Sequence, residues 1–148
     1  MNDIEGLEGE EFVMTVELGK VREMARATGL SDYVDVVAAG DSSPPTFLTT
    51  QRNWQTGSAD TWRLAGLHER LMLHAEQEYV FHGPPPPVGA RLRCRSQITK
   101  EWHKDANSGK RLHFVEMTTW FRGADGSLIA EARMTGVEVL SDGGGGPR

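Results

Sequence analysis

A histidine and a glutamate lie two residues apart in an alternating stretch of the chain, at His74 and Glu76. In a β-strand such a pair projects from one face, where it can relay a proton or form an ion pair at a subunit interface. The spacing identifies no further group that would orient the imidazole for acid–base catalysis. We therefore keep His74 and Glu76 as catalytic candidates and favour the interface role.

Three arginines alternate with other residues farther along the chain, at Arg91, Arg93 and Arg95. Alternation predicts that all three guanidinium groups project from one face of a strand, while Leu92 and Cys94 project from the other. A row of this kind can bind phosphate groups. An ordinary solvated outer face is the alternative that we favour.

Other kinds of site find no support in the residue pattern. The one cysteine, Cys94, cannot form an intramolecular disulfide, and the five histidines do not follow the spacing of zinc ligands. The chain has 16 Lys and Arg against 21 Asp and Glu, a net charge of −5, which disfavours nucleic-acid binding. An acidic N-terminus and the absence of a long apolar run predict a cytoplasmic protein that does not bind membranes.

The 148 residues are enough for one domain, which we place at residues 1–140, followed by a disordered glycine-rich tail at residues 141–148. A short β-prone run at Phe12–Val16 precedes an amphipathic helix over 20–28 that ends at Gly29. A second helix is expected to begin with Thr46 as its N-cap. A further helical stretch is expected between Ala59 and Leu73.

The period of the pattern changes to two at Leu73 and predicts a strand over 73–82. Leu73, Tyr79 and Phe81 are expected on its core face and His74 on the opposite face. Three long strands follow, separated by two loops with the composition of hairpin turns, and they are predicted over Arg91–Lys104, Arg111–Arg122 and Ser127–Leu140. The fold class is therefore α+β, with one curved antiparallel sheet wrapped on helices.

Four segments occur in an order typical of a known protein family, and they are Thr15–Ala27, Ser43–Phe47, Leu73–Pro84 with Val88–Leu92, and the hairpin around Asp125-Gly126. Together they resemble the N-terminal, FAS1-like half of MaoC-type dehydratases over about residues 12–139. The resemblance implies a hot-dog fold, in which a bent antiparallel sheet wraps around a central helix and two subunits pair. It also implies reversible hydration of trans-2-enoyl thioesters of CoA or acyl carrier protein, without a metal or redox cofactor.

The resemblance also indicates where a ligand would bind. In a hot-dog the central helix packs beside the ligand, so its residues are candidates for binding the acyl chain together with His74. These helix candidates are Pro45, Thr46, Phe47, Leu48 and Trp54. The arginines at 91, 93 and 95 become candidates for the phosphates of CoA.

The catalytic residues of the family are missing from this chain. Catalytic members carry a run similar to Asp-x-Asn-Pro-x-His after a helix that ends in Thr-Gly, and the corresponding positions here are Leu30, Asp32 and Asp35. No histidine precedes His68. The resemblance therefore implies an accessory subunit that holds the acyl chain, while a catalytic MaoC-like hot-dog partner supplies the Asp/His pair.

Two alternatives remain open at this point. The chain can instead pair with itself as a non-catalytic homodimer that binds acyl-CoA. It can also be a hot-dog acyl-CoA thioesterase that uses a carboxylate such as Glu76 or Asp35 to activate water. A carboxylate beside the thioester would distinguish the thioesterase from the other two.

Overall fold

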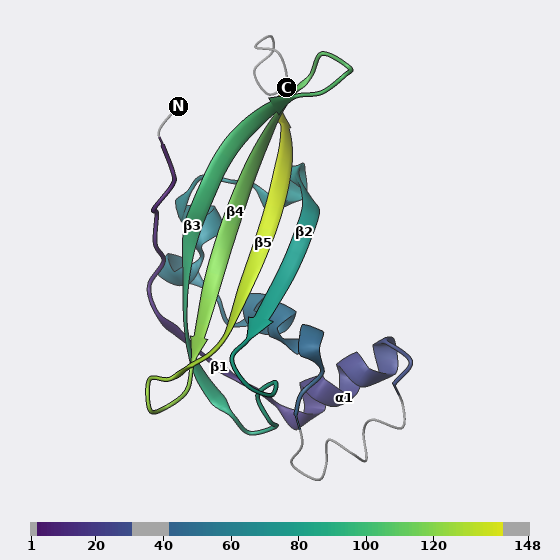
Figure 1. The fold of residues 1–148 in the computed structure, drawn as a ribbon, viewed down its shortest axis with the longest axis vertical. Coiled ribbons are helices and arrows are strands. Elements are labelled where there is room, and N and C mark those ends of the chain that lie inside the picture. Colours follow the sequence, from purple (N-terminus) through teal and green to yellow (C-terminus); the bar gives the residue numbers. More distant parts are fainter. Residues whose placement is uncertain (1–2, 31–41, 141–148) are drawn as a thin grey trace.

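The computed structural model describes residues 3–30 and 42–140 and shows a curved five-stranded antiparallel sheet with helices along its inner face (Figure 1). The strand order is β1-β3-β4-β5-β2. The strands are β1 (Phe12–Thr15), β2 (Met72–Phe81), β3 (Arg91–Asp105), β4 (Arg111–Arg122) and β5 (Leu128–Leu140). The helices are α1 (Leu18–Ala27), α3 (Thr61–Leu64) and the 3₁₀ helices η1 (Pro45–Asn53), η2 (Gly57–Ala59) and η3 (Glu69–Leu71). The predicted α+β class with a hot-dog sheet is confirmed.

Two hairpins join the three long strands as the sequence predicts. Strand β3 pairs with β4 and β4 pairs with β5, both antiparallel. Each tight turn contains a glycine with a left-handed backbone, Gly109 at φ 78° and Gly126 at φ 83°. Other residues rarely adopt this conformation, so these two glycines help to determine where the strands reverse.

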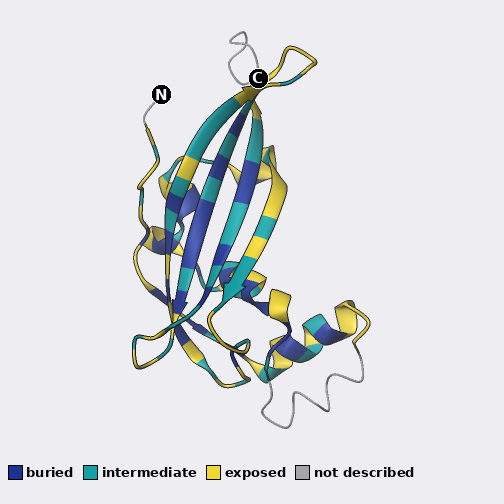
Figure 2. Cartoon of the chain, in the orientation of Figure 1, coloured by how far each residue is buried: buried dark blue, intermediate teal, exposed yellow. Residues whose placement is uncertain are grey.

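The core lies on the inner face of the sheet. Met14, Cys94, Val115, Met117 and Phe121 are fully buried there, and Figure 2 shows that burial is concentrated along the central strands. Strand β2, at one edge of the sheet, is much more exposed along its length. The sheet is therefore anchored by β3, β4 and β5, whereas β2 forms an accessible border.

Two of the three predicted helices differ from expectation. Helix α1 is confirmed, but the second helix is a 3₁₀ helix that begins at Pro45, and Thr46 makes no capping hydrogen bond. Because proline suits the first position of a helix, the N-cap is Pro44, two residues earlier than expected, and Thr46 lies inside the first turn. The stretch between Ala59 and Leu73 is mostly not helical, since α3 is only four residues long and Gly66 follows it with φ 72°.

Some expectations fall outside the described residues. The glycine-rich tail at 141–148 is one of them, so the domain boundary at residue 140 stays a prediction. Asp32 and Asp35, which occupy the positions of the catalytic pattern, are also outside the described part of the chain. Within residues 3–30 and 42–140, no helix combines the length and the apolar character that are needed to span a membrane.

Gly9 provides a stability test of the contact between the N-terminal segment and the helical layer. A Cβ atom at Gly9 would lie 2.7 Å from the backbone oxygen of Ala59 and 2.9 Å from Oγ1 of Thr61. Gly9→Ala should therefore lower the free energy of unfolding by about 1–3 kcal/mol, as overpacking does, measured by urea denaturation.

The matched control is Gly19→Ala in helix α1, where the added Cβ meets nothing within 4 Å. This change should raise the free energy of unfolding by about 0.5–1 kcal/mol, because alanine loses less backbone entropy than glycine in a helix. Equal effects of the two substitutions would contradict the close approach at Gly9.

Candidate functional site

Strand β2 contains an irregularity near its N-terminal end. His74 pairs with Gly136 of β5, but Glu76 pairs with the adjacent Thr135, so Ala75 is an extra residue in β2. This is a β-bulge, in which two residues of one strand oppose one residue of its neighbour. Because consecutive residues of β5 point to opposite faces, His74 and Glu76 also lie on opposite faces of the sheet.

The bulge overturns two expectations about this strand. His74 shares the inner face with Tyr79 and Phe81, whereas Leu73 lies on the outer face and is 64% exposed. The predicted same-face pair of His74 and Glu76 is wrong, because strict alternation fails where a residue is inserted. Glu76 therefore does not lie beside the imidazole as a proton relay would require.

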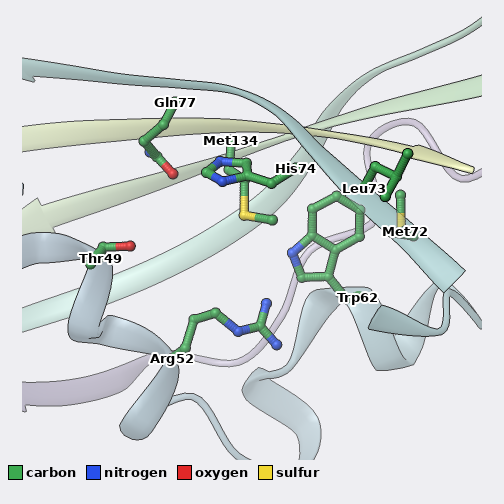
Figure 3. Close-up of a pocket in the computed structure, with 8 residues that line it drawn as sticks. All are labelled: Thr49, Arg52, Trp62, Met72, Leu73, His74, Gln77 and Met134. Carbon is green, nitrogen blue, oxygen red and sulfur yellow. The ribbon is translucent and has the colours of Figure 1, made fainter. Parts of the chain in front are cut away.

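His74 lines a cavity of about 250 Å³ between β2 and the helical layer, which we call the edge cavity (Figure 3). Three elements besides β2 contribute side chains: η1, α3 and β5. The complete lining is Thr49, Arg52, Trp62, Met72, Leu73, His74, Gln77 and Met134. The cavity lies at the border of the sheet, where His74 and Thr49 are exposed.

Trp62 forms the buried end of the edge cavity and is 2% exposed. Its ring packs over Gly136, because a Cβ atom at that glycine would lie 3.2 Å from Cη2 of Trp62 and 2.6 Å from Cε of Met72. The inner face of β5 therefore needs a glycine at the register position opposite His74. Residue spacing along the chain does not indicate that Trp62 lines a cavity.

The polar groups of the edge cavity include several hydrogen-bond donors but, among the described residues, no carboxylate. Arg52, Thr49, His74 and the indole of Trp62 can all donate, and no Asp or Glu occurs among the described residues that line the cavity. Nearby on the same face, burial raises the pKa of Tyr79, although a hydrogen bond with Thr49 partly opposes the shift. The cavity can bind an acceptor, but these residues provide no carboxylate to orient His74.

The other predicted acyl-binding residues lie outside this lining. Phe47 and Leu48 are each 1% exposed and pack in the core, and Trp54 is half-buried against the same cluster. Pro45 and Thr46 are exposed at the start of η1. Helix η1 instead contributes Thr49, from its middle, and Arg52, near its C-terminal end, to the lining of the cavity.

The arginine row projects from one face of β3 as predicted, but two of its members already have carboxylate partners. Arg93 donates two hydrogen bonds of 2.9 Å to Glu11, and Arg95 pairs with Glu8. The Arg93 guanidinium lowers the pKa of Glu11. A phosphate would have to displace these carboxylates from Arg93 and Arg95. Phosphate binding by the row stays a prediction, and Arg91 is its best candidate.

Arg91 lines a second, larger cavity of about 550 Å³, which surrounds the loop of four prolines at 84–87. Much of that lining consists of exposed loop residues without buried polar groups directed into it. We take the edge cavity as the candidate site because it combines a buried donor, a histidine and an arginine with apolar walls, as ligand sites commonly do.

A third cavity contains a cluster of titratable groups on the inner face, near the β3–β4 hairpin. His113 is hydrogen-bonded through Nε2 to Glu101 at 2.7 Å, and its Nδ1 lies 3.7 Å from Glu138. The ring of His103 stacks on that of His113 with 4.7 Å between centroids. Among the described residues, no group of three or more His, Cys, Asp or Glu side chains is arranged to hold a metal ion.

Comparisons with known proteins agree with this architecture. The family model of the FAS1-like dehydratase domain region matches residues 4–132. No curated protein sequence gives a significant match.

Several solved structures have a similar fold. One is the HadBC (3R-hydroxyacyl-ACP dehydratase) complex from Mycobacterium tuberculosis, with 23% identity, a TM-score of 0.65, and coverage of 92% of this chain and 98% of that chain. Another is a MaoC-like dehydratase, with 19% identity and a TM-score of 0.68. That alignment covers 93% of this chain and 43% of that chain. The ChsH1-ChsH2 complex from Mycobacterium tuberculosis has 12% identity, a TM-score of 0.64, and coverage of 93% and 91%. At these identities the similarity establishes the fold.

Proposed function

Because the chain belongs to the FAS1-like dehydratase family, we propose that it is an accessory, acyl-chain-binding subunit of a MaoC-like enoyl-CoA hydratase or 3-hydroxyacyl-thioester dehydratase. The acyl group would enter the edge cavity, and a catalytic hot-dog partner would supply the Asp/His pair. We place this activity in the cytoplasm, in fatty acid or steroid side-chain metabolism, with no cofactor other than the CoA or carrier-protein thioester itself.

The observation that carries the accessory role is the chemistry of the edge cavity. Its described lining contains one imidazole, His74, and no carboxylate, whereas hydration needs a base for water and an acid for the substrate. Glu76, the nearest carboxylate in sequence, lies on the other face of β2. Leu30, at the position of the family's catalytic aspartate, cannot transfer a proton.

The edge position of the cavity supports a partner subunit. Strand β2 ends the sheet, and no strand among the described residues pairs with its outer side. An exposed edge of ten residues is a natural place for another chain to bind. The volume of about 250 Å³ is also somewhat below the roughly 300–1,000 Å³ of ordinary ligand pockets, so a second subunit would complete the site.

The names of two similar structures fit this proposal. HadBC and ChsH1-ChsH2 are each described as complexes. A catalytic hot-dog chain with an intact Asp-x-Asn-x-x-His run, encoded next to this one, would be the expected partner. The thioesterase alternative loses Glu76 as its carboxylate, because Glu76 faces away from the edge cavity, and its other candidate, Asp35, lies outside the described residues.

The first experiment measures hydration of short, long and sterol-like enoyl-CoA substrates by the purified chain, with its mass determined in the same buffer. We expect no hydration by the chain alone and hydration once the catalytic hot-dog partner is added. Hydration by a lone homodimer that disappears in His74→Ala would overturn the accessory role. If the chain forms an inactive homodimer that binds acyl-CoA but does not associate with a hot-dog partner, the result would favour the alternative of a non-catalytic acyl-CoA-binding homodimer.

A further inference from the structure

The indole nitrogen of Trp62 is a buried donor without an acceptor. Trp62 is 2% exposed, and none of the described residues accepts a hydrogen bond from its Nε1. Figure 3 shows the nitrogen-bearing edge of the ring turned toward Arg52 and the interior of the edge cavity. Leaving a buried polar group unpaired is unfavourable, so a ligand that brings an acceptor atom to this donor would gain a hydrogen bond that the protein alone does not make.

A buried hydrogen-bond network fixes the residue that precedes Trp62. The hydroxyl of Thr61 donates to the backbone oxygen of Ser96 at 3.3 Å, and the Gln55 amide donates to the Ser96 hydroxyl at 3.1 Å. The Ser96 hydroxyl is also hydrogen-bonded to Thr119 at 2.7 Å. These contacts attach the start of α3 to β3 and β4, so the backbone that carries Trp62 is held in place.

The opposite edge of the indole is also confined. It packs against Gly136 and Met72, and Trp62 belongs to a core cluster with Ile98, Val115 and Met117. The ring therefore cannot turn its nitrogen toward another acceptor without disturbing the core. A donor fixed in this way selects a ligand by the position of its acceptor atom.

The surroundings of Nε1 define the chemistry of that ligand. Met72 and Met134 provide apolar walls that suit a hydrocarbon chain, while His74 and Arg52 add donors and Arg52 adds positive charge. A purely saturated chain would leave the indole donor unpaired. An acyl chain that carries an oxygen atom would bury its hydrocarbon and satisfy the donor.

We propose that Trp62 is a specificity-determining residue, whose indole N–H selects acyl groups that carry a keto or hydroxyl oxygen farther along the chain than the reacting carbons over acyl groups without one. The inference rests on the proposed function, because it assumes that the edge cavity takes the acyl group of a thioester. It deepens that function by naming the class of acyl group.

The test measures binding of decanoyl-CoA and of a series of keto-decanoyl-CoAs, each with one ketone along the chain, to the full chain by titration calorimetry. We expect at least one keto-acyl-CoA to bind about five- to tenfold more tightly than decanoyl-CoA, the effect of one hydrogen bond. Trp62→Phe should abolish this preference while retaining binding of decanoyl-CoA. Trp120→Phe is the matched control and should keep the preference, because Trp120 lies outside the edge cavity and donates to Glu131.

A second readout does not depend on whether Trp62→Phe folds. In the wild-type chain, the indole N–H resonance of Trp62 should move downfield when the preferred keto-acyl-CoA is added, and it should move much less with decanoyl-CoA. Equal affinities together with an unmoved resonance would overturn the inference and leave the proposed function intact. A preference that persists in Trp62→Phe would also overturn it. Failure of every acyl-CoA to bind would refute the proposed function and, with it, this inference.

Discussion

Replacing His113 with alanine is expected to lower the free energy of unfolding by about 1–3 kcal/mol, the usual effect of leaving a buried hydrogen-bonding group without its partner. The side chain of His113 is 7% exposed and lies between Glu101 and Glu138, whose side chains are 12% and 24% exposed. Without the imidazole, these two carboxylates lose their shared partner in a poorly solvated part of the inner face. Urea denaturation of the variant and the wild type measures the difference.

The matched control is His82→Ala. His82 is also paired with a glutamate, Glu131, at 3.1 Å, but its side chain is 41% exposed. Exposed pairs contribute at most about 1 kcal/mol, so this change should have little effect. A similar loss of stability in both variants would show that the cluster around His113 has no special role in the fold.

The Cys94 thiol is expected to react with thiol reagents on the order of a thousandfold more slowly in the folded chain than in urea-unfolded chain. Burial raises the pKa of Cys94 to about 12, opposed by a hydrogen bond from the backbone of Met14. The thiolate is the reacting species, and a pKa near 12 instead of 9 lowers its population about a thousandfold near pH 8. Colour release from a disulfide reagent measures both rates, and equal rates would contradict the buried position.

The same shift predicts how stability depends on alkaline pH. The folded state holds the proton more tightly than the unfolded state, so the stabilisation is complete below the pKa of the unfolded thiol. It is lost as pH rises from about 9 toward 12, at about 1.4 kcal/mol per pH unit. Cys94→Ala should show a shallower decline over this range, whereas an unchanged decline would assign it to other groups.

The sheet was predictable because its signals are local. The four strands from Met72 onward alternate over long runs, and the two hairpin glycines, Gly109 and Gly126, mark the turns between three of them. The pairing of His103 with His113 follows from the same hairpin, since residues at equal distances from a turn face each other. Counting residues outward from the predicted turn would therefore have placed His103 opposite His113. The spacing of the histidines along the chain does not show that they are neighbours.

The lining of the edge cavity was mostly not predictable. Only His74 was identified, and its face was wrong because a bulge depends on how the neighbouring strand pairs, which the sequence of one strand does not reveal. Thr49, Arg52 and Met134 come from other elements and share no motif with it. The helical stretch expected between Ala59 and Leu73 is limited to the four residues of α3 and a later 3₁₀ turn, because Gly66 adopts a left-handed backbone with φ 72° soon after α3 ends.

The bulge at Ala75 affects how this chain should be aligned with its relatives. In a relative whose strand is regular, an alignment without a gap at Ala75 would match Ala75, not His74, to the residue that lies opposite the position of Gly136 and faces the cavity. If both chains had a histidine in the alignment column of His74, the two side chains would then lie on opposite faces of their sheets. The strand is compared correctly only when residues are counted from the C-terminal side of Ala75 and the inserted residue is given its own gap.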